Sequence, residues 1–204
     1  MANLRILLIT QKKSEVLNKL LESKDVIGII EPREDNSSTS ILEKAIFKNV
    51  KSVAKKHNIP YLLMKDKKQE ILGWIKEKNP DLIVVYSMPF LLKEEIFSYP
   101  KFGTINLHTA LLPKYRGAVP IFWTYYFFDR NAGVTVHYID KGEDTGDIIL
   151  QRNVNVDLGE RYYDLRIKFE AAGALTLIES INKIESNTVQ RIKQPVESPT
   201  PRAR

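Results

Sequence analysis

The sequence predicts an α/β protein with a mostly parallel, twisted sheet and helices on both faces of that sheet. Three observations predict this class. Nearly continuous apolar runs at residues 4–10, 25–30 and 81–86 suit strands that are covered on both sides. Amphipathic helical patterns separate these runs, and strands that alternate with helices form βαβ crossovers. The length of 204 residues, 43% of them hydrophobic, is enough for one sizeable core.

The first half of the chain supplies most of the predicted parallel sheet. A strand at residues 4–10 passes through the polar turn 11–13 into a helix at 14–23, which carries an apolar stripe. The helix before Pro80 ends there because the residue preceding a proline disfavours helical backbone. The remaining elements, in chain order, are a strand at 25–30, a loop at 33–40, a helix at 41–57, a strand at 60–64, a helix at 68–78 and a strand at 81–86.

The second half ends in two further strands, a long helix and a tail. Strands at 133–139 and 148–156 alternate more clearly between apolar and polar residues, so we expect them nearer an edge. A helix follows at 161–184. The tail from Gln194 places three prolines among polar and basic residues, cannot build a core, and is expected to be extended or mobile. We expect one folded domain at residues 1–185 and a short tail at 186–204.

Composition excludes several classes of protein and site. The chain has no cysteine, which excludes disulfides and thiolate metal sites and fits a reducing, cytoplasmic location. No apolar run approaches the roughly 20 residues that span a bilayer, so no membrane association is expected. The net charge of +6 favours anionic ligands, although the lysine pairs also suit a solvated surface. The turn at residues 10–14 contains no glycine, which argues against a dinucleotide site, and there is no P-loop.

Three residues form the candidate catalytic group. Asn106 and His108 are two apart on a predicted strand, so their side chains point to the same face. Asp144 lies in a loop bounded by Gly142 and Gly146 between two predicted strands. A carboxylate beside this Asn/His pair can orient the imidazole, support its cation, or take a proton from an incoming nucleophile.

The two other histidines are assigned structural or surface roles. His137 shares a strand face with Thr135, opposite two valines, and is interpreted as structural. His57 ends a predicted helix and is interpreted as solvated. Three scattered histidines without cysteine predict no metal site.

The stretch from residue 104 to 151 resembles the active-site region of the 10-formyltetrahydrofolate-dependent formyltransferases. Four motifs match in order and spacing, INLH, LLPKYRG, GVTVH and DTGDII, and a weaker resemblance extends from about residue 4 to 185. The family includes methionyl-tRNA, glycinamide ribonucleotide and sugar N-formyltransferases. The resemblance implies a Rossmann-like formyltransferase core, 10-formyltetrahydrofolate as the formyl donor, and Asn106, His108 and Asp144 as the catalytic trio.

Formyl transfer is an acyl transfer that needs an oxyanion donor and a group that manages protons. Asn106 is the uncharged donor, and His108 either donates as an imidazolium or shuttles a proton as a neutral ring. Asp144 either raises the pKa of His108 or relays a proton through water. The sequence leaves this division of roles open. The triplet after Leu107 is HTA where relatives commonly have HPS or HGS, which places the hydrogen bonding of the following loop in doubt.

Further residues are predicted to bind the two substrates. Lys114 and Arg116 place cations beside the catalytic strand, where an anionic group of the substrate could be held. The alternative is that Arg116 ties its loop to an acidic neighbour. The resemblance also points to two loops that would hold the flat pterin of the folate; their residues are Tyr86, Ser87, Met88, Phe90, Leu91, Ile139, Asp140, Lys141, Gly142 and Glu143.

The acceptor amine is the least determined part of the prediction. The glycine-free first turn argues against glycinamide ribonucleotide, and methionyl-tRNA enzymes add a C-terminal barrel. We therefore expect the amino group of a nucleotide-linked amino sugar, with nucleic acid an unlikely partner because no aromatic-basic platform is evident. The alternatives are an enzyme like methionyl-tRNA formyltransferase, a formyltetrahydrofolate hydrolase, and a non-catalytic folate-binding module. A homodimer is possible.

Overall fold

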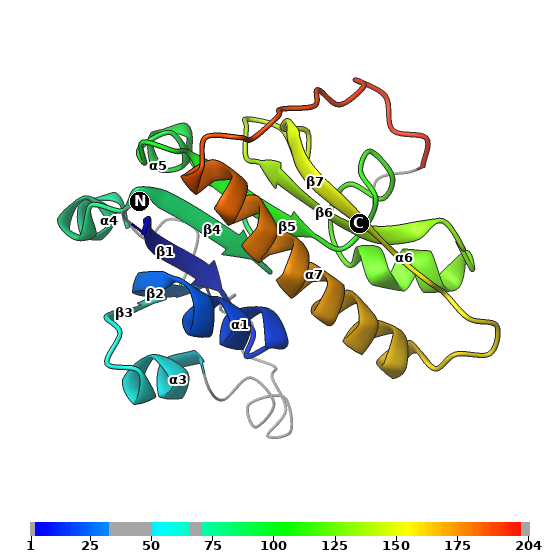
Figure 1. Ribbon diagram of the computed structural model, residues 1–204, viewed down its shortest axis with the longest axis horizontal. Helices are drawn as coiled ribbons and strands as arrows, with labels where there is room; N and C mark the ends of the chain where they lie inside the picture. Colours follow the sequence, from blue (N-terminus) through cyan, green and yellow to red (C-terminus); the bar gives the residue numbers. More distant parts are fainter. Residues whose placement is uncertain (1–2, 33–49, 66–70, 201–204) are drawn as a thin grey trace. The chain divides into compact units, whose positions relative to one another are not determined.

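The structure is a computed structural model and describes residues 3–32, 50–65 and 71–200 (Figure 1). The chain divides into two compact units, an N-terminal unit of residues 2–104 and a C-terminal unit of residues 105–204. Each unit has its own sheet strands and helices. The predictions for the loop at 33–40, for most of the helix at 41–57 and for the start of the helix at 68–78 lie outside the described residues.

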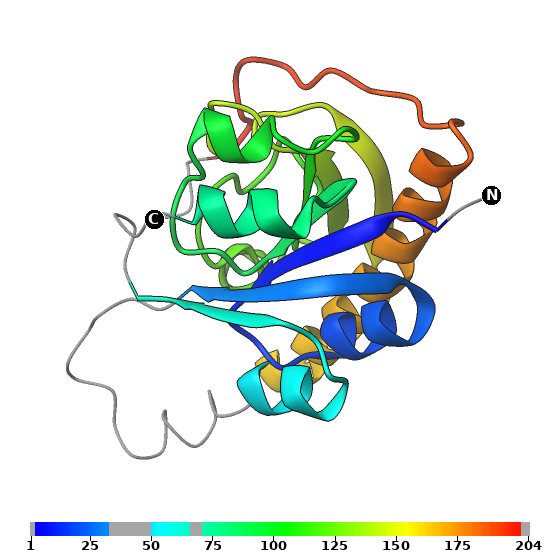
Figure 2. The ribbon, with the colours of Figure 1, turned by 90° about the vertical axis from the view of Figure 1, so that its left-hand side faces the viewer.

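The N-terminal unit contains four parallel strands. They are β1 (Arg5–Thr10), β2 (Asp25–Pro32), β3 (Tyr61–Met64) and β4 (Leu82–Tyr86), in the order β3-β2-β1-β4. Figure 2 shows β1, β2 and β3 side by side. Strands β1 and β4 are almost wholly apolar and buried, as their continuous apolar runs predict.

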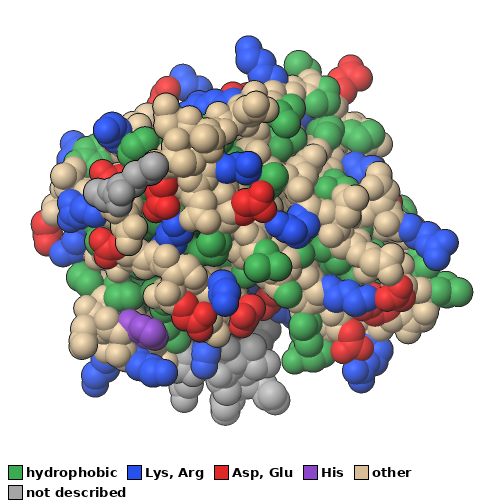
Figure 3. Space-filling model, viewed as in Figure 1, with side chains coloured by type: hydrophobic (Ala, Val, Ile, Leu, Met, Phe, Trp, Pro, Cys, Tyr) green, Lys and Arg blue, Asp and Glu red, His purple; other side chains and the backbone are tan. Residues whose placement is uncertain are grey.

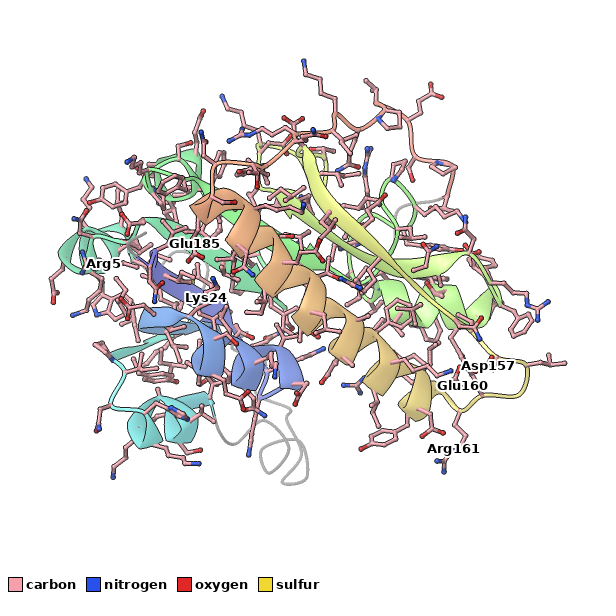
Figure 4. All side chains as sticks on the ribbon, viewed as in Figure 1. Arg5, Lys24, Asp157, Glu160, Arg161 and Glu185 are labelled. Carbon is pink, nitrogen blue, oxygen red and sulfur yellow. The ribbon has the colours of Figure 1, made fainter. Side chains whose placement is uncertain are left out.

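Helices α1 (Glu15–Ser23) and α3 (Val50–Lys56) follow the first two strands, and α4 (Leu72–Lys78) and the short α5 (Glu94–Phe97) follow the next. Helix α1 starts where the sequence predicts, since the Ser14 hydroxyl accepts a hydrogen bond from the Leu17 amide at 3.2 Å. Helix α4 packs directly on β2: a Cβ built on Gly28 would lie 2.9 Å from the Trp74 ring. The guanidinium of Arg5, labelled in Figure 4, donates to the carbonyls of Lys78 and Asn79 at the end of α4.

The C-terminal unit contains an antiparallel sheet covered by one long helix. Its strands are β5 (Thr104–His108), β6 (Ala132–Tyr138) and β7 (Ile148–Val154), and each pairs antiparallel with the next. Helix α7 (Tyr162–Glu185) packs against β6 and β7, and the short helix α6 (Pro120–Tyr126) lies between β5 and β6 in the chain. The loop that enters α7, where Figure 4 labels Asp157 and Glu160, is tied to the helix by Lys168 at 2.6 and 2.8 Å.

The predicted α/β class is confirmed, with strands and helices alternating along the chain. The strands at 133–139 and 148–156 are present as β6 and β7, and β7 ends the strand order, as expected for an edge. Helices α5 and α6 were not predicted. Among the described residues, none of the helices is both long and apolar enough to cross a bilayer.

Candidate active site

Strand β5 carries two apolar residues, Ile105 and Leu107, on one face and polar residues, among them Asn106 and His108, on the other. Leu107 faces helix α7 so closely that a Cβ on Gly173 would lie 2.9 Å from its side chain. Asn106 and His108 therefore point to the opposite face, as predicted from the strand period. In the antiparallel register Asn106 pairs with His137, and His108 pairs with Thr135. The sheet of this unit thus has one apolar face against α7 and one polar face.

The Asp144 carboxylate lies against this polar face. One oxygen, Oδ1, accepts from the Asn106 amide at 3.2 Å and lies 3.3 Å from His137 Nε2. The other, Oδ2, accepts from the Gly117 backbone N–H at 2.9 Å and lies 3.4 Å from His108 Nδ1. The predicted spatial meeting of Asn106, His108 and Asp144 is therefore present in the structure.

Two unusual backbone positions make this meeting possible. Gly117 has φ of 102°, a conformation that side chains rarely adopt, and it presents its N–H to the carboxylate. Asp144 itself has φ of 53°, in the left-handed region where Asp is tolerated at a cost. Positive φ at a non-glycine residue is a form of strain that clusters at functional sites.

The protons of the two imidazoles follow from their fixed partners. Nε2 of His108 is 2.8 Å from the carbonyl of Tyr115, which can only accept, so this nitrogen carries the hydrogen. Nδ1 of His137 is likewise 2.8 Å from the carbonyl of Tyr138. In the neutral rings, Nδ1 of His108 and Nε2 of His137 are then acceptors. The lone pair of His108 Nδ1 and the Asp144 carboxylate face each other across 3.4 Å, where one proton could be held.

Burial and charge together determine the protonation states of His108 and Asp144. Burial lowers the pKa of His108 below its usual value, against the raising effect of the Asp144 carboxylate. Burial opposes ionisation of Asp144, yet the imidazoles of His108 and His137, when they carry the extra proton, and the Gly117 N–H hold its pKa well below the usual range. At neutral pH the site therefore contains a neutral imidazole beside an ionised carboxylate.

His137 belongs to the cluster, although the sequence analysis assigned it only a structural role. Its side chain is 2% exposed, and its Nε2 lies 3.2 Å from the Asn106 amide as well as close to Asp144. The signal was available: His137 is in the GVTVH motif and shares its strand face with Thr135. What the sequence could not supply was the register that pairs His137 with Asn106.

Thr135, the other polar residue on that strand face, shapes the loop after β5. Its hydroxyl donates to the carbonyl of Ala110 at 2.6 Å and accepts from the amide of Leu112 at 3.0 Å. Gln151 on β7 completes the arrangement by donating to Thr135 and to the carbonyl of Leu112. These bonds fix the loop whose detailed hydrogen bonding the HTA triplet had left in doubt.

Arg116 contacts the C-terminal segment of the protein itself, and its role with substrate stays a prediction. The side chain is 2% exposed, and its guanidinium donates to the Gln194 side chain and to the carbonyls of Pro195 and Val196. The alternative, that Arg116 ties its loop to an acidic neighbour, is wrong, because these partners are neutral oxygens. Lys114 forms an ion pair with Asp129 at 2.7 Å and is partly exposed, so its role with substrate stays a prediction.

The residues predicted to hold the folate lie in two separate loops, one in each unit. In the N-terminal unit, Tyr86 is buried at the end of β4, Ser87 has φ of 64°, and Leu91 is 68% exposed. Met88 and Phe90 are half-buried in the same loop. In the C-terminal unit, Asp140 organises the turn of residues 139–143 by accepting from the Gly142 amide and the Thr145 hydroxyl. Their contact with folate stays a prediction.

Sequence reasoning missed a set of exposed aromatic side chains on and after α6. Five of them are 39% to 66% exposed: Phe122, Tyr125, Tyr126, Phe127 and Phe128. Neighbouring rings contact one another, and the guanidinium of Arg130 lies 5.9 Å from the centre of the Phe128 ring. The aromatic run was visible in the sequence, but without an amphipathic pattern its exposure was not predicted.

Charge and metal-binding groups give no further site. On the face shown in Figure 3, basic and acidic side chains are interspersed. Within the described ranges, no three His, Cys, Asp or Glu side chains are placed to hold a metal ion.

Comparisons with known proteins identify the family. A family model described as formyl transferase matches residues 5–181. A methionyl-tRNA formyltransferase of Clostridioides difficile (strain 630) is 38% identical over 177 residues, which are 86% of this chain and 57% of that protein. The chain thus spans little more than half the length of this relative.

Two solved structures share the fold. Glycinamide ribonucleotide transformylase 1 from Symbiobacterium toebii has a TM-score of 0.76 at 20% identity, over 94% of this chain and 95% of that one. A Mycobacterium tuberculosis protein described as a candidate sugar N-formyltransferase has a TM-score of 0.70 at 16% identity, over 97% and 75%. The extent of the family match and the identity to the curated relative show that the chain belongs to the formyl transferase family.

Proposed function

We propose that the protein transfers the formyl group of 10-formyltetrahydrofolate to the amino group of methionyl-tRNA. The observation that carries the formyl-transfer part is the Asp144 carboxylate held between His108, Asn106 and the Gly117 N–H. The methionyl-tRNA part is supported by curated relatives of that name, such as those 38% and 33% identical over 86% and 87% of the chain.

The amino-sugar acceptor expected from the sequence has weaker support. A candidate sugar N-formyltransferase is similar at 16% identity, a level at which the likeness concerns the fold alone. The expectation that nucleic acid is an unlikely partner is not supported either, because the curated relatives are named for a tRNA substrate. We therefore propose methionyl-tRNA as the acceptor in place of the nucleotide-linked amino sugar. The proposed location remains the cytoplasm.

In the proposed reaction the amine adds to the formyl carbon, negative charge develops on the formyl oxygen, and the amine loses a proton. The His108–Asp144 pair suits the proton step, since a neutral imidazole nitrogen and a carboxylate oxygen face each other at 3.4 Å. A proton taken up there would be shared between two acceptors and stabilised by the carboxylate charge. It can then return to the folate nitrogen that leaves.

Asn106 is the proposed donor to the formyl oxygen. Its amide hydrogens are directed to Asp144 Oδ1 and His137 Nε2, both at 3.2 Å. A bound formyl oxygen would take one of these hydrogens, which leaves the other to hold the amide in place. Donors that are fixed before the reaction stabilise developing charge more effectively than mobile ones.

The side chains of the site suit a folate that carries a formyl group. This group is the one-carbon unit at the oxidation level of formate. Asn106 and Asp144 are only partly buried, whereas His108 is 5% exposed and His137 2%. A substrate would therefore meet the amide and the carboxylate first. We propose that the pterin contacts the turn of residues 139–143, which directly precedes Asp144 in the C-terminal unit. A role for the residues near Ser87 and Leu91 stays a prediction.

The exposed aromatic side chains of residues 122–128 suit a nucleic-acid substrate. Aromatic rings stack on unpaired bases without regard to sequence, and a neighbouring Arg adds a cation. Tyr126, at 66% exposure, is the clearest candidate for stacking on the acceptor end of the tRNA. A Tyr126→Ala variant is expected to raise the KM for methionyl-tRNA while leaving the KM for the folate unchanged.

The test uses purified protein, 10-formyltetrahydrofolate and four acceptor conditions: methionylated initiator tRNA, uncharged tRNA, a nucleotide-linked amino sugar, and no acceptor. Tetrahydrofolate release and formyl-methionine are measured together. Turnover with methionyl-tRNA and none with uncharged tRNA is the expected result. Turnover only with the sugar overturns the acceptor, and release without acceptor favours the hydrolase. No turnover in any condition favours a folate-binding module.

A further inference from the structure

The C-terminal segment, residues 192–200, is bound to two loops of the C-terminal unit. Its first residue, Ile192, exchanges backbone hydrogen bonds with Ile148 at 2.8 and 2.9 Å. Further along, Ser198 donates to the carbonyl of Pro113 at 2.6 Å, and Thr200 accepts from the amide of Tyr115 at 2.7 Å. The tail was expected to be extended or mobile, whereas these bonds join it to the loop before Gly117 and to the start of β7.

Between these anchors, the Gln194 side chain joins the two loops to each other. Its Nε2 donates to the carbonyl of Asp144 at 3.1 Å and to that of Gly146 at 2.7 Å. Its Oε1 accepts from Nε and Nη2 of Arg116 at 3.3 and 3.0 Å. The amide orientation follows from its partners, because two carbonyls need a donor and a guanidinium needs an acceptor.

Both loops that Gln194 joins position the Asp144 carboxylate. Arg116 precedes Gly117, whose N–H binds Oδ2 of Asp144, and the two carbonyls belong to the turn that carries Asp144. That turn has Asp144 at a positive φ, which the surrounding contacts must hold. Gly146 packs closely in this turn, since a Cβ there would clash with the carbonyl oxygen of Tyr138.

We propose that Gln194 is a positioning residue that holds the Asp144 turn so that the carboxylate reaches His108. This inference rests on the proposed function for its kinetic consequences. It gives the tail a role in the site, although the tail was expected to be separate from the folded domain.

Two substitutions of Gln194 separate positioning from simple anchoring of the tail. Gln194→Met keeps the length and removes both the donor and the acceptor. Gln194→Glu keeps an acceptor for Arg116, with added charge attraction, but has no hydrogens for the carbonyls of Asp144 and Gly146. If Gln194 only anchors the tail, the Glu variant stays fully active. If it holds the turn, both variants lose activity alike.

We expect kcat to fall by about 10- to 100-fold in both variants, the loss that small misplacements of catalytic groups produce. KM for both substrates should stay within about threefold, because the change concerns the chemical step. The control is Glu197→Gln, an exposed residue three positions further along the same segment. Its kcat should equal that of the unsubstituted protein.

A second readout needs no turnover. NMR titration of the His108 imidazole reports how close the Asp144 carboxylate lies. Burial and His137 lower the pKa of His108, whereas Asp144, the Tyr115 carbonyl and Glu143 raise it. If the turn shifts in Gln194→Met, the Asp144 contribution weakens and His108 titrates at lower pH than in the unsubstituted protein.

The proposal is overturned by a Gln194→Glu variant with full kcat, or by unchanged His108 titration in Gln194→Met. These results are distinguishable from failure of the proposed function. If the unsubstituted protein formylates no amine, that function fails, while the titration still decides whether Gln194 positions Asp144.

Discussion

Replacement of Asp144 by asparagine should nearly abolish turnover while leaving the protein folded. The side chain keeps its size and one oxygen, so the Gly117 N–H at 2.9 Å can retain its acceptor. The new NH2 then faces the Asn106 amide, which loses the acceptor it had at 3.2 Å. His137 Nε2 is close enough to accept from either amide, which limits the loss.

The magnitudes separate the effect on stability from the effect on chemistry. One buried hydrogen bond lost to a charged acceptor costs about 2 kcal/mol, so the melting temperature should fall by roughly 4–8 °C. Loss of the group that manages the proton should lower kcat by about a thousandfold, or ~4 kcal/mol of barrier. A domain that starts with about 5–15 kcal/mol of stability remains folded at 25 °C.

The assay is the initial rate of formyl-methionyl-tRNA formation at saturating substrates, with circular dichroism melting on the same samples. Asp147→Asn is the matched control, since Asp147 is half-buried at the end of the same turn and makes the same change of charge. It should keep kcat within about threefold. An Asp144→Asn variant with more than a tenth of the original kcat would refute the assigned proton role, and one that unfolds at 25 °C would show a structural role.

Acid sensitivity gives the Asp144 variant a second signature. Because the folded-state pKa of Asp144 lies below its unfolded value, the carboxylate contributes stability that is present above about pH 4 and is lost as the pH falls further. Asparagine does not titrate. The difference in unfolding free energy between the two proteins should therefore shrink as the pH is lowered from 7 to 3, as measured by urea denaturation.

Three further predictions concern the framework of the site. His108→Gln should lessen the stability that is lost between pH 7 and 5. Because the folded-state pKa of His108 is lowered, the unfolded chain binds a proton at this residue before the folded chain does as the pH falls. Urea titrations that show equal losses of unfolding free energy in the variant and the unsubstituted protein would contradict this. Gly133→Ala should cost about 3 kcal/mol or more of unfolding free energy, since its Cβ would lie 2.2 Å from the Arg152 carbonyl oxygen. Gly73→Ala, with open space around it in α4, should instead stabilise the protein by about 0.5–1 kcal/mol. Thermal melts that rank the two variants in the opposite order would disprove the packing argument. Phe169→Ala should cost about 3–5 kcal/mol because the ring is wholly buried, and a loss under 1 kcal/mol in denaturant would exclude it from the core.

The parts of the fold and site that could be predicted have local sequence signatures. The apolar run of β4 and the apolar stripe of α1 are such signals, and both elements occur where expected. The same holds for Asn106 and His108, whose spacing of two residues fixes a common strand face. Asp144 was identified by its motif, and its distance to His108 could then be measured in the structure.

The parts that could not be predicted depend on partners without a sequence signature. Arg116 binds carbonyl oxygens, which every residue possesses, so nothing in the chain pointed to the C-terminal segment. The assignment of His137 depended on the register between β5 and β6, which hydrophobic alternation alone does not determine. Helix α6 lacks the apolar stripe that predicts a helix, because its aromatic side chains are largely exposed.

The alternation of side chains along β5 links the direction of Asn106 and His108 to the packing of Leu107 in the interior of the protein. Leu107 is locked into α7 beside Gly173, and its two neighbours are directed by that packing. A single residue inserted ahead of Leu107 would reverse the whole strand, burying the imidazole under α7 and turning aliphatic side chains toward the substrate. Insertions in this strand should therefore be tolerated only in pairs, while the loops at either end can change length without reversing the two faces of the strand.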